Sequence, residues 1–362
     1  MNIHKLFILT VFILTGFGLI MVASASGYQS QYSFGSSSYL FFLQFFRGFG
    51  IGIIGFIAGY LTKPWLVKRL SLPFVLASII LLAVVLLPGI GIEHGGSRRW
   101  LSIGGLSFQP SELGKMALLF YSSSWLASRK EDIRSFRKGF LPFLVLSVPI
   151  PILILLEPNI SNFGISFALI LVLLFSAGAK IWHLLGLAST VILLFLLSLV
   201  FLPQRLERIL TFINPRIDPQ GSSYQINQSL TAIGSGGLEG KGLGGSTQKR
   251  GILPEPSGDA IFAVIAEEFG FIGGGLVVLT YLLFVLEGII IALHNSDAFS
   301  RYVALGFSSL IALQAFINVS AVSGLLPLTG VTLPFISYGG TSLAVFLTAS
   351  GVVARMAKRT HD

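Results

Sequence analysis

Residues 5–25 read KLFILTVFILTGFGLIMVASA, an apolar run of 21 residues whose only charge is its first residue. A helix needs about 20 apolar residues to cross ~30 Å of bilayer hydrocarbon, so this run predicts a transmembrane helix. Ala23-Ser24-Ala25 resembles a signal-peptidase site. Because the run is long and more apolar runs follow it, we expect a retained span.

Nine further apolar runs predict an all-α polytopic membrane protein with ten transmembrane helices in a single domain, residues 1–362. The ten runs are residues 5–25, 39–61, 72–90, 110–128, 140–157, 160–178, 181–202, 261–293, 302–323 and 341–357. The eighth would be ~50 Å long as a helix, so part of it should lie outside the hydrocarbon. Residues 203–260, before this run, form one large loop that we expect to be extracellular.

The composition excludes the main alternative classes. Hydrophobic residues make up 53% of the chain and charged residues 11%, against about 25% charged in soluble domains. Disordered chains are poor in apolar residues, so disorder is excluded as well. The chain has no cysteine, which excludes disulfides and thiol catalysis.

The net charge of +9 follows from the placement of Lys and Arg around the spans. With a cytoplasmic N-terminus, fourteen of them fall in inner loops and ends, and only Arg98 and Arg99 fall in the short outer loops. The positive-inside rule therefore predicts that both termini are cytoplasmic. Nothing in this pattern indicates nucleic-acid binding, which needs a basic soluble patch with interleaved aromatics.

Several charged residues lie near the outer ends of spans, where an ionisable group indicates function or an ion pair. Glu112 and Lys115 are three residues apart and lie on the same face of a helix. They either form an internal ion pair or belong to a polar cavity that Lys115 lines. Arg99 and Trp100 either lie at the membrane interface as belt residues or bind a phosphate group. The planar guanidinium of Arg99 matches the geometry of a phosphate. Arg47, inside the second span, should face a cavity or a partner.

Four more acidic or amide residues flank the later spans. Asp259 precedes an apolar helical run, so it caps that helix or acts as a general base toward a substrate hydroxyl. Glu157 and Asn159 surround Pro158 in what the sequence predicts as a turn. Glu267, further along the eighth run, needs a cationic partner or water.

Two glycine-rich segments give weaker signals. Residues 234–245 fail the nucleotide P-loop pattern. Residues 326–340, with two prolines and several glycines, predict irregular backbone that is buried or lines a wet cavity. Gln314 and Asn318 lie one helical turn apart and are expected to anchor this segment. The five scattered histidines lack the spacing of zinc ligands.

Eight motifs in this order resemble the SEDS family (shape, elongation, division and sporulation), which includes RodA and FtsW. They are Gly96-Ser-Arg-Arg-Trp-Leu101, Gln109-Pro-Ser-Glu-Leu-Gly-Lys115, Glu157-Pro158, Tyr224-Gln-Ile-Asn-Gln-Ser229, Leu253-Pro-Glu-Pro256 with Asp259-Ala-Ile-Phe262, Ala266-Glu-Glu-Phe-Gly270, Gln314-Ala-Phe-Ile-Asn318 and Leu333-Pro-Phe-Ile-Ser-Tyr-Gly-Gly340. The Pro254–Pro256 and Phe335–Tyr338 stretches favour the division-type branch.

The resemblance implies a peptidoglycan glycosyltransferase of the bacterial cytoplasmic membrane that polymerises lipid II with a class B penicillin-binding protein. Asp259 matches the family's catalytic carboxylate. A divalent cation, Mg²⁺ or Mn²⁺, could assist the pyrophosphate leaving group. The candidate substrate-binding residues are Arg47, Arg99, Trp100, Glu112, Lys115, Glu157, Asn159, Glu255, Glu267, Ser337 and Tyr338.

Two departures from the family motifs keep alternatives open. Ser257-Gly258 replaces the family's His-Thr before the catalytic Asp, and Asn159 replaces a carboxylate after Pro158. A lipid II flippase and a non-catalytic scaffold for a penicillin-binding protein are the alternative functions.

Overall fold

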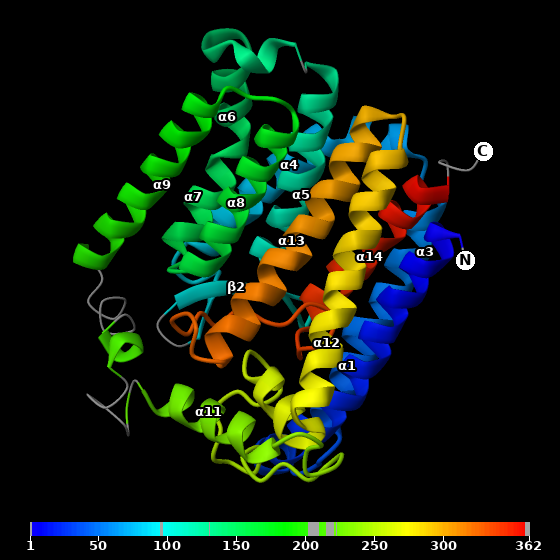
Figure 1. Ribbon diagram of the computed structural model, residues 1–362. Coiled ribbons are helices and arrows are strands. Elements are labelled where there is room, and N and C mark those ends of the chain that lie inside the picture. The colour runs from blue at the N-terminus through cyan, green and yellow to red at the C-terminus, as the bar shows by residue number, and fades with distance from the viewer. Residues whose placement is uncertain are drawn as a thin grey trace.

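The structure is a computed structural model that describes residues 2–94, 97–129, 131–201, 210–214, 221 and 223–358. Long helices run side by side through most of the molecule (Figure 1). The described residues leave out Gly96 of the first motif, two of the fourteen inner cations, Lys130 and Arg359, and most of residues 203–222 of the large loop.

Each of the ten predicted spans is helical. The corresponding helices are α1 (Ile3–Phe34), α2 (Tyr39–Leu43) with η1 (Gln44–Gly50) and α3 (Ile51–Leu61), α4 (Pro64–Val85), α5 (Pro110–Ser128), η3 (Phe136–Phe140) with α6 (Leu141–Ser147) and α7 (Pro149–Leu156), α8 (Ile160–Ser176), α9 (Ile181–Phe201), α12 (Ile261–His294), α13 (Ala298–Val322) and α14 (Gly340–Lys358). The short helix η2 (Asp132–Arg134) lies between α5 and η3, and α11 (Tyr224–Gly236) belongs to the large loop.

Within the described residues, seven helical stretches are long and apolar enough to cross a membrane, and α8 and α9 are shorter apolar helices. The helix α5 is not among them because it carries Glu112, Lys115 and a run of serines. The helix α4 begins earlier than predicted, so Lys68 and Arg69 lie within its first turns.

Short strands, which the sequence analysis missed, form an antiparallel sheet in the order β1 (Ile92–His94), β2 (Ser97–Ile103) and β3 (Leu106–Phe108). Gly104 and Gly105 turn the chain between β2 and β3 with φ of +59° and +78°. Two consecutive positive φ angles define the favoured two-residue hairpin turn. The hairpin fixes the position of β2, which carries Arg99 and Trp100.

The helix α12 contains a kink at Gly270, where φ is +64° and ψ is −165°. A Cβ at this position would lie 2.3 Å from the carbonyl oxygen of Leu238, so only glycine allows the loop to approach. The helix α12 spans 34 residues, as long as the sequence indicated, and the expectation that part of it lies outside the hydrocarbon stays a prediction.

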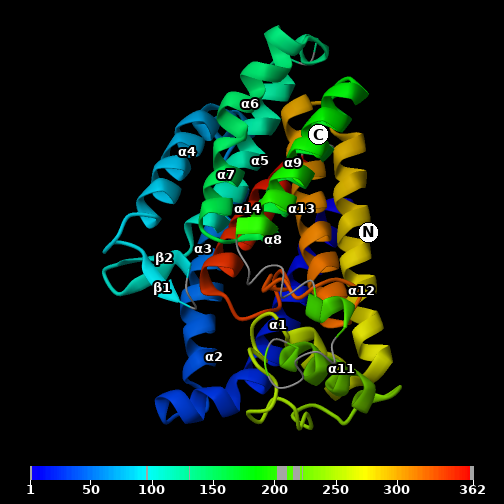
Figure 2. The ribbon, with the colours of Figure 1, turned by 90° about the vertical axis from the view of Figure 1, so that its left-hand side faces the viewer.

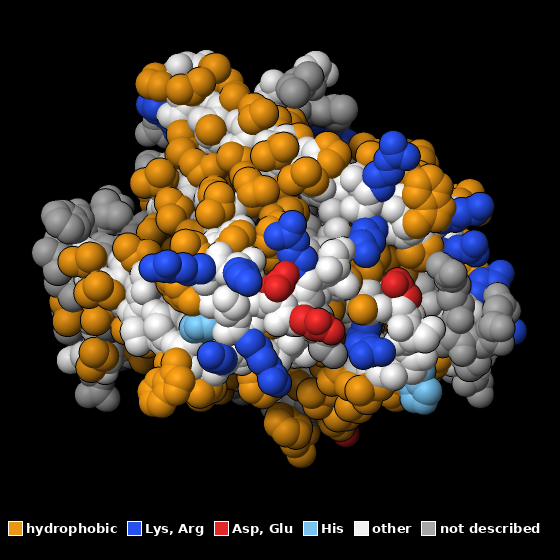
Figure 3. Space-filling model, turned by 90° about the horizontal axis from the view of Figure 1, so that it is seen from above, with side chains coloured by type: hydrophobic (Ala, Val, Ile, Leu, Met, Phe, Trp, Pro, Cys, Tyr) orange, Lys and Arg blue, Asp and Glu red, His pale blue; other side chains and the backbone are white. Residues whose placement is uncertain are grey.

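One end of the molecule is rich in Lys and Arg side chains. Figure 3 views the end with the α5–α6 and α12–α13 connections, where Lys and Arg side chains gather. The strands and α11 lie toward the opposite end in both ribbon views (Figure 2). The clustering is what the positive-inside rule requires, and the assignment of this face to the cytoplasm stays a prediction.

Candidate active site

A cavity of about 1150 Å³ lies between the hairpin, α2–η1–α3, α5, α14 and two loop segments. Its polar lining includes Gln44, Arg47, Ser97, Arg99, Trp100, Glu255, Asp259, Thr332 and Tyr338. Its apolar lining comes from α3, α4, α5 and α14, for example Ile51, Phe74, Met116 and Val345. One hollow therefore offers charged groups and hydrocarbon-compatible walls together.

Asp259 is half-buried on the wall of this cavity. Its Oδ1 accepts a hydrogen bond from Gln225 Nε2 at 3.2 Å, and its carbonyl oxygen accepts one from Asn318 Nδ2 at 2.8 Å. The N-cap position of α12 is Ala260, and no side chain of the described residues caps this helix. The alternative that Asp259 caps α12 is therefore wrong, because its carboxylate points elsewhere.

Glu255 brings a second carboxylate to the same wall. Its φ is +47°, a left-handed conformation that costs a non-glycine residue about 1–3 kcal/mol and is typical of functional sites. The turn is closed by hydrogen bonds from Gly258 N and Ala260 N to Glu255 O, at 3.0 and 3.3 Å. This turn places Glu255 and Asp259 on one side of the cavity.

The segment before α14 holds this turn in place. Ser337 Oγ donates to Gly258 O at 2.7 Å, and Tyr338 N donates to Ser257 O at 2.7 Å. Ser337 is buried and acts as a brace, whereas Tyr338 lines the cavity. Burial raises the pKa of the Tyr338 hydroxyl above its ordinary value, with Tyr39 adding to the rise and Arg47 opposing it.

The helix α13 anchors the irregular segment through two amides, as the sequence predicted. Gln314 Nε2 donates to Thr332 O at 3.1 Å. Asn318 Nδ2 donates to Val331 O at 2.6 Å as well as to Asp259 O. Asn318 therefore ties the Asp259 backbone to the irregular chain at Val331.

Arg99 reaches the cavity from β2 and is fixed by the turn between α7 and α8. Its Nε donates to Glu157 O at 3.0 Å and its Nη2 donates to Pro158 O at 2.7 Å. Asn159 closes the same turn, because its side chain accepts from Asn162 N and caps α8. The predicted turn at residues 157–159 is confirmed.

The Glu157 side chain, just past the end of α7, is fully buried behind this turn, and neither carboxyl oxygen has a hydrogen-bond partner among the described residues. Burial raises the pKa of Glu157 to about 8, although the nearby Arg99 charge opposes the rise. The carboxyl group is thus mainly protonated at neutral pH and does not line the cavity.

Lys115 is completely buried below the cavity. Its Nζ contacts Glu112 Oε1 at 2.8 Å, Asn162 Oδ1 at 3.1 Å and Gln314 Oε1 at 3.0 Å. An ammonium has three donors, and these contacts use all of them. The ion-pair alternative is confirmed, and the structure does not bring Glu112 or Lys115 to the cavity surface.

Glu267 has the cationic partner that the sequence required, but it lies away from the cavity lining. It pairs with Lys241 at 2.6 Å and accepts a hydrogen bond from Thr247 N at 3.1 Å. The next residue, Glu268, pairs with Lys249 at 2.5 Å. Both carboxylates fasten residues 241–249 to the start of α12.

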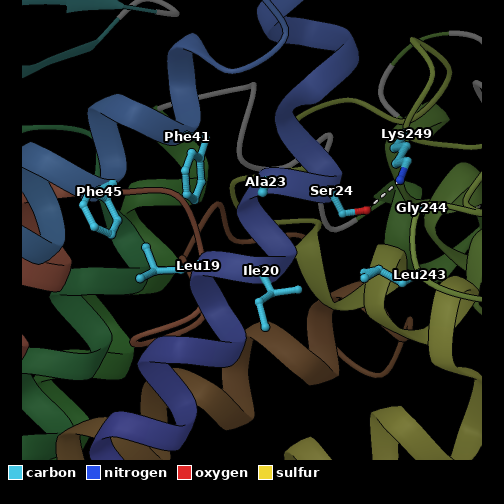
Figure 4. A pocket seen from close by; sticks show the side chains of 9 residues that line it. All are labelled: Leu19, Ile20, Ala23, Ser24, Phe41, Phe45, Leu243, Gly244 and Lys249. Carbon is cyan, nitrogen blue, oxygen red and sulfur yellow. Dashed lines mark hydrogen bonds between the residues drawn. The ribbon is translucent and has the colours of Figure 1, made fainter.

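A second hollow of about 610 Å³ lies between α1, α2–η1 and residues 243–249. Its lining is mostly apolar, with Phe41 and Phe45 on one side (Figure 4). The polar groups at its edge are engaged, since Lys249 Nζ donates to Ser24 Oγ at 2.7 Å. This hollow offers no reactive group.

Several residues in or next to the cavity were not predicted from the sequence. Gln44 lies three residues before Arg47 on the same helix face, a spacing that could have indicated it. Gln225, which does not line the cavity but donates to Asp259 Oδ1, was quoted only as part of a motif. Ser97 and Thr332 carry no local signal, because their placement depends on the hairpin and on α13. Among the described residues, no cluster of three or more His, Asp or Glu could hold a metal.

The fold and this cavity define an integral membrane protein whose helix bundle holds a charged, amphipathic cavity near one end. The family model described as cell cycle protein, which is named for FtsW, RodA and SpoVE, matches residues 4–362. The chain belongs to this family.

Known relatives cover nearly the whole chain. Stage V sporulation protein E of Bacillus subtilis is 40% identical over 353 residues, 98% of this chain and 96% of that protein. A protein of Geobacter sulfurreducens named probable peptidoglycan glycosyltransferase FtsW is 38% identical over 352 residues, covering 96% and 92%.

Two solved structures share the fold at 26% sequence identity. One comes from work titled structural coordination of polymerization and crosslinking by a peptidoglycan synthase complex, with a TM-score of 0.81 and 98% of both chains covered. The other is the rod shape determining protein RodA of Thermus thermophilus, with a TM-score of 0.71 and coverage of 98% and 97%.

Proposed function

We propose that this chain is a peptidoglycan glycosyltransferase that polymerises lipid II at the outer face of the bacterial cytoplasmic membrane. One observation carries the proposal: a single cavity joins the Asp259 carboxylate to Arg47, Arg99 and apolar walls. The names of the relatives, among them probable peptidoglycan glycosyltransferase FtsW, support it.

The reaction joins two sugars and releases a lipid pyrophosphate. Asp259 accepts the proton of the attacking sugar 4-hydroxyl as the new bond from that oxygen to the anomeric carbon forms. The bond from the anomeric carbon to the pyrophosphate oxygen breaks, and its electron pair leaves with the pyrophosphate. Arg47 and Arg99 line the same cavity and offset this developing charge, the electrostatic role that most strongly lowers such barriers.

The apolar walls fit the rest of the substrate. A polyprenyl tail must stay in hydrocarbon while its sugar and pyrophosphate groups reach charged residues. The cavity meets both needs, because Phe74, Met116 and Val345 lie on its apolar side and the charged residues on its polar side. A purely polar cleft would accept only the head of such a molecule.

We further propose that Mg²⁺ or Mn²⁺ joins the site with its substrate. Glu255 and Asp259 supply two carboxylates to the cavity wall, too few for a preformed protein cage but suited to Mg²⁺ that is also bound by substrate phosphates. A bound divalent cation would supply further positive charge at the leaving pyrophosphate.

The solved structure from the peptidoglycan synthase complex supports a partnership with a class B penicillin-binding protein. The FtsW and SpoVE names of the relatives support a division or sporulation role over elongation. With the cationic face of Figure 3 in the cytoplasm, both termini are cytoplasmic and the large loop and cavity face outward.

The test is a polymerisation assay with purified protein, its penicillin-binding partner, lipid II and Mg²⁺ or Mn²⁺. Wild type should make glycan strands, and Asp259→Asn and Asp259→Ala should not. Glu239→Gln, an exposed carboxylate in the same large loop, is the matched control and should behave as wild type. Absence of strands from wild type bound to its partner would favour the flippase or scaffold instead.

A further inference from the structure

The second hollow, between α1, α2–η1 and the large loop, is an open trough with apolar walls (Figure 4). Its floor is α1 at residues 19–24, which belong to the first apolar run of the sequence. The rings of Phe41 and Phe45 form one wall, and Leu243 of the large loop lies on the other. Ile20 on the floor is 51% exposed and Leu243 is 59% exposed, so the second hollow opens to the surroundings of the helix bundle.

Tyrosines beyond the floor indicate how deep in the membrane the second hollow lies. Tyr28 and Tyr32, the next outward residues on this side of α1, are 51% and 86% exposed. Tyrosine gathers where hydrocarbon meets the lipid headgroups. At 1.5 Å per residue, Leu19 lies about 13 Å along the helix from Tyr28. The second hollow therefore lies at the depth of acyl chains, in the leaflet nearest to the large loop.

Polar groups begin at the end of the second hollow that is nearest to the tyrosines. Ser24 Oγ accepts a hydrogen bond from Lys249 Nζ at 2.7 Å, and Lys249 is paired with the Glu268 carboxylate. The charge of this lysine is already balanced, so Lys249 closes the second hollow without attracting an anion.

Arg250, the next residue, brings a cation that is not balanced in this way. It is exposed, and among the described residues its guanidinium has no hydrogen-bond or ion-pair partner. Its neighbour Gly251 packs against the Tyr28 ring, where an added Cβ would lie 2.7 Å from Cε1. Because Lys249 is bonded to Ser24 and Gly251 contacts Tyr28, Arg250 is held about one turn of α1 further out than the second hollow.

This order of groups matches that of a phospholipid. Along α1 toward the large loop come the apolar floor, the Ser24 hydroxyl and then Arg250. A phospholipid presents an acyl chain, ester groups and a phosphate in the same order. A planar guanidinium matches the geometry of phosphate. Because lipid tails are equally apolar wherever they lie in the bilayer, the headgroup charge must supply the selectivity.

The helix α2–η1 separates the second hollow from the active cavity. Phe41 and Phe45 line the second hollow, whereas Gln44 and Arg47 line the cavity. On its other side this helix is closely packed, since a Cβ on Gly48 would lie 3.2 Å from Gly340 Cα. A molecule whose charged head reaches Arg47 therefore lies on the other side of this wall.

We propose that the second hollow binds one acyl chain of an anionic phospholipid whose phosphate is held by Arg250. With the cationic end of the protein in the cytoplasm, this lipid comes from the outer leaflet. It fills the space behind the helix that carries Arg47. The site is independent of the reaction in the cavity, so it stands whether or not the chain polymerises lipid II.

The test identifies the lipids that stay bound to the full-length protein. The protein is reconstituted in nanodiscs with equal parts of phosphatidylglycerol and phosphatidylcholine, released into mild detergent and studied by native mass spectrometry. Wild type should retain phosphatidylglycerol in preference to phosphatidylcholine. Ala23→Phe places a ring in the second hollow from an exposed position and should abolish this retention. Arg250→Gln should lower the preference for phosphatidylglycerol about 10-fold, because hydrogen bonds to charged groups are the stronger ones.

Each variant has a matched control. Ile13→Phe adds the same ring to α1 at an exposed position outside the second hollow. Arg98→Gln removes a cation from the hairpin strand β2. Both controls should retain phosphatidylglycerol as wild type does, and thermal unfolding of every variant confirms that the fold is intact.

The outcomes that would overturn the proposal are distinct. Retention of no phospholipid by wild type, or equal retention by Ala23→Phe and wild type, would show that the second hollow is not a lipid site. Equal retention of the two phospholipids by wild type would refute the role of Arg250. If added lipid II or the penicillin-binding partner displaces the phospholipid, the second hollow belongs to that molecule instead.

Discussion

Replacing Glu157 with glutamine should make the folded protein less sensitive to alkaline pH. The wild-type carboxyl is fully buried without a hydrogen-bond partner among the described residues, and burial raises its pKa from 4.5 to about 8. The folded state therefore binds the proton more tightly than the unfolded state. The contribution of Glu157 to the free energy of unfolding is most favourable below pH 4.5. It falls as the pH rises from 4.5 to about 8 and is constant at higher pH.

The size of the effect follows from the two pKa values. One pKa unit corresponds to about 1.4 kcal/mol. Relative to acidic pH, the free energy of unfolding is therefore lower by ~3 kcal/mol at pH 7, where the unfolded state ionises and the folded state stays protonated, and by ~5 kcal/mol at pH 9. Glutamine has a similar shape and no charge. It also leaves the carbonyl oxygen of residue 157, which accepts from Arg99 Nε, in place.

The assay is thermal unfolding of the detergent-solubilised protein between pH 5 and pH 9. Glu157→Gln should melt at a higher temperature than wild type at pH 9, and the difference should shrink toward pH 5. Glu131→Gln, an exposed carboxylate on another connection, is the control and should track wild type throughout. If the melting temperatures of Glu157→Gln and wild type change in parallel with pH, a neutral, buried Glu157 is refuted.

Three further predictions concern residues that hold the cavity walls and the large loop in place. Asn318→Ala loses its bonds to Asp259 O and Val331 O, and turnover of lipid II should fall at least ~10-fold; unchanged turnover would show that the Asp259 backbone needs no such anchor. Arg99→Lys cannot reproduce the forked contact with Glu157 O and Pro158 O, so glycan synthesis should drop about 10-fold or more, measured beside Arg98→Lys. Lys241→Met leaves the buried Glu267 carboxylate without its cation, so limited proteolysis should cleave residues 241–250 sooner; equal cleavage rates would contradict a clamping role.

The features that could be predicted from the sequence belong to a single segment or to two residues about one helical turn apart. Apolar run length located the ten helices because a bilayer crossing is a property of one segment. The pairing of Glu112 with Lys115 followed from their three-residue spacing. The anchoring by Gln314 and Asn318 was predictable because two amides on one face, next to irregular backbone, need acceptors.

The features that the sequence missed depend on contacts between distant segments. Gly104-Gly105 is a hairpin signal, but the surrounding strands are too short and too charged to show clear alternation. The cap assignment of Asp259 failed because its side chain is taken by Gln225 from a separate helix. Lys115 and Glu267 were correctly expected to need partners, but only the packed structure shows that these partners lie outside the cavity lining.

The adjacent carboxylates Glu267 and Glu268 set a limit on how this loop can evolve. They form ion pairs with Lys241 and Lys249, respectively, and so fix the positions of both lysines. The spacing of eight residues between these lysines is therefore constrained. An insertion or deletion there would pull one lysine from its carboxylate and leave a buried charge unpaired. Relatives that keep both acidic residues and both lysines should therefore show substitutions between the lysines, but no change in their spacing.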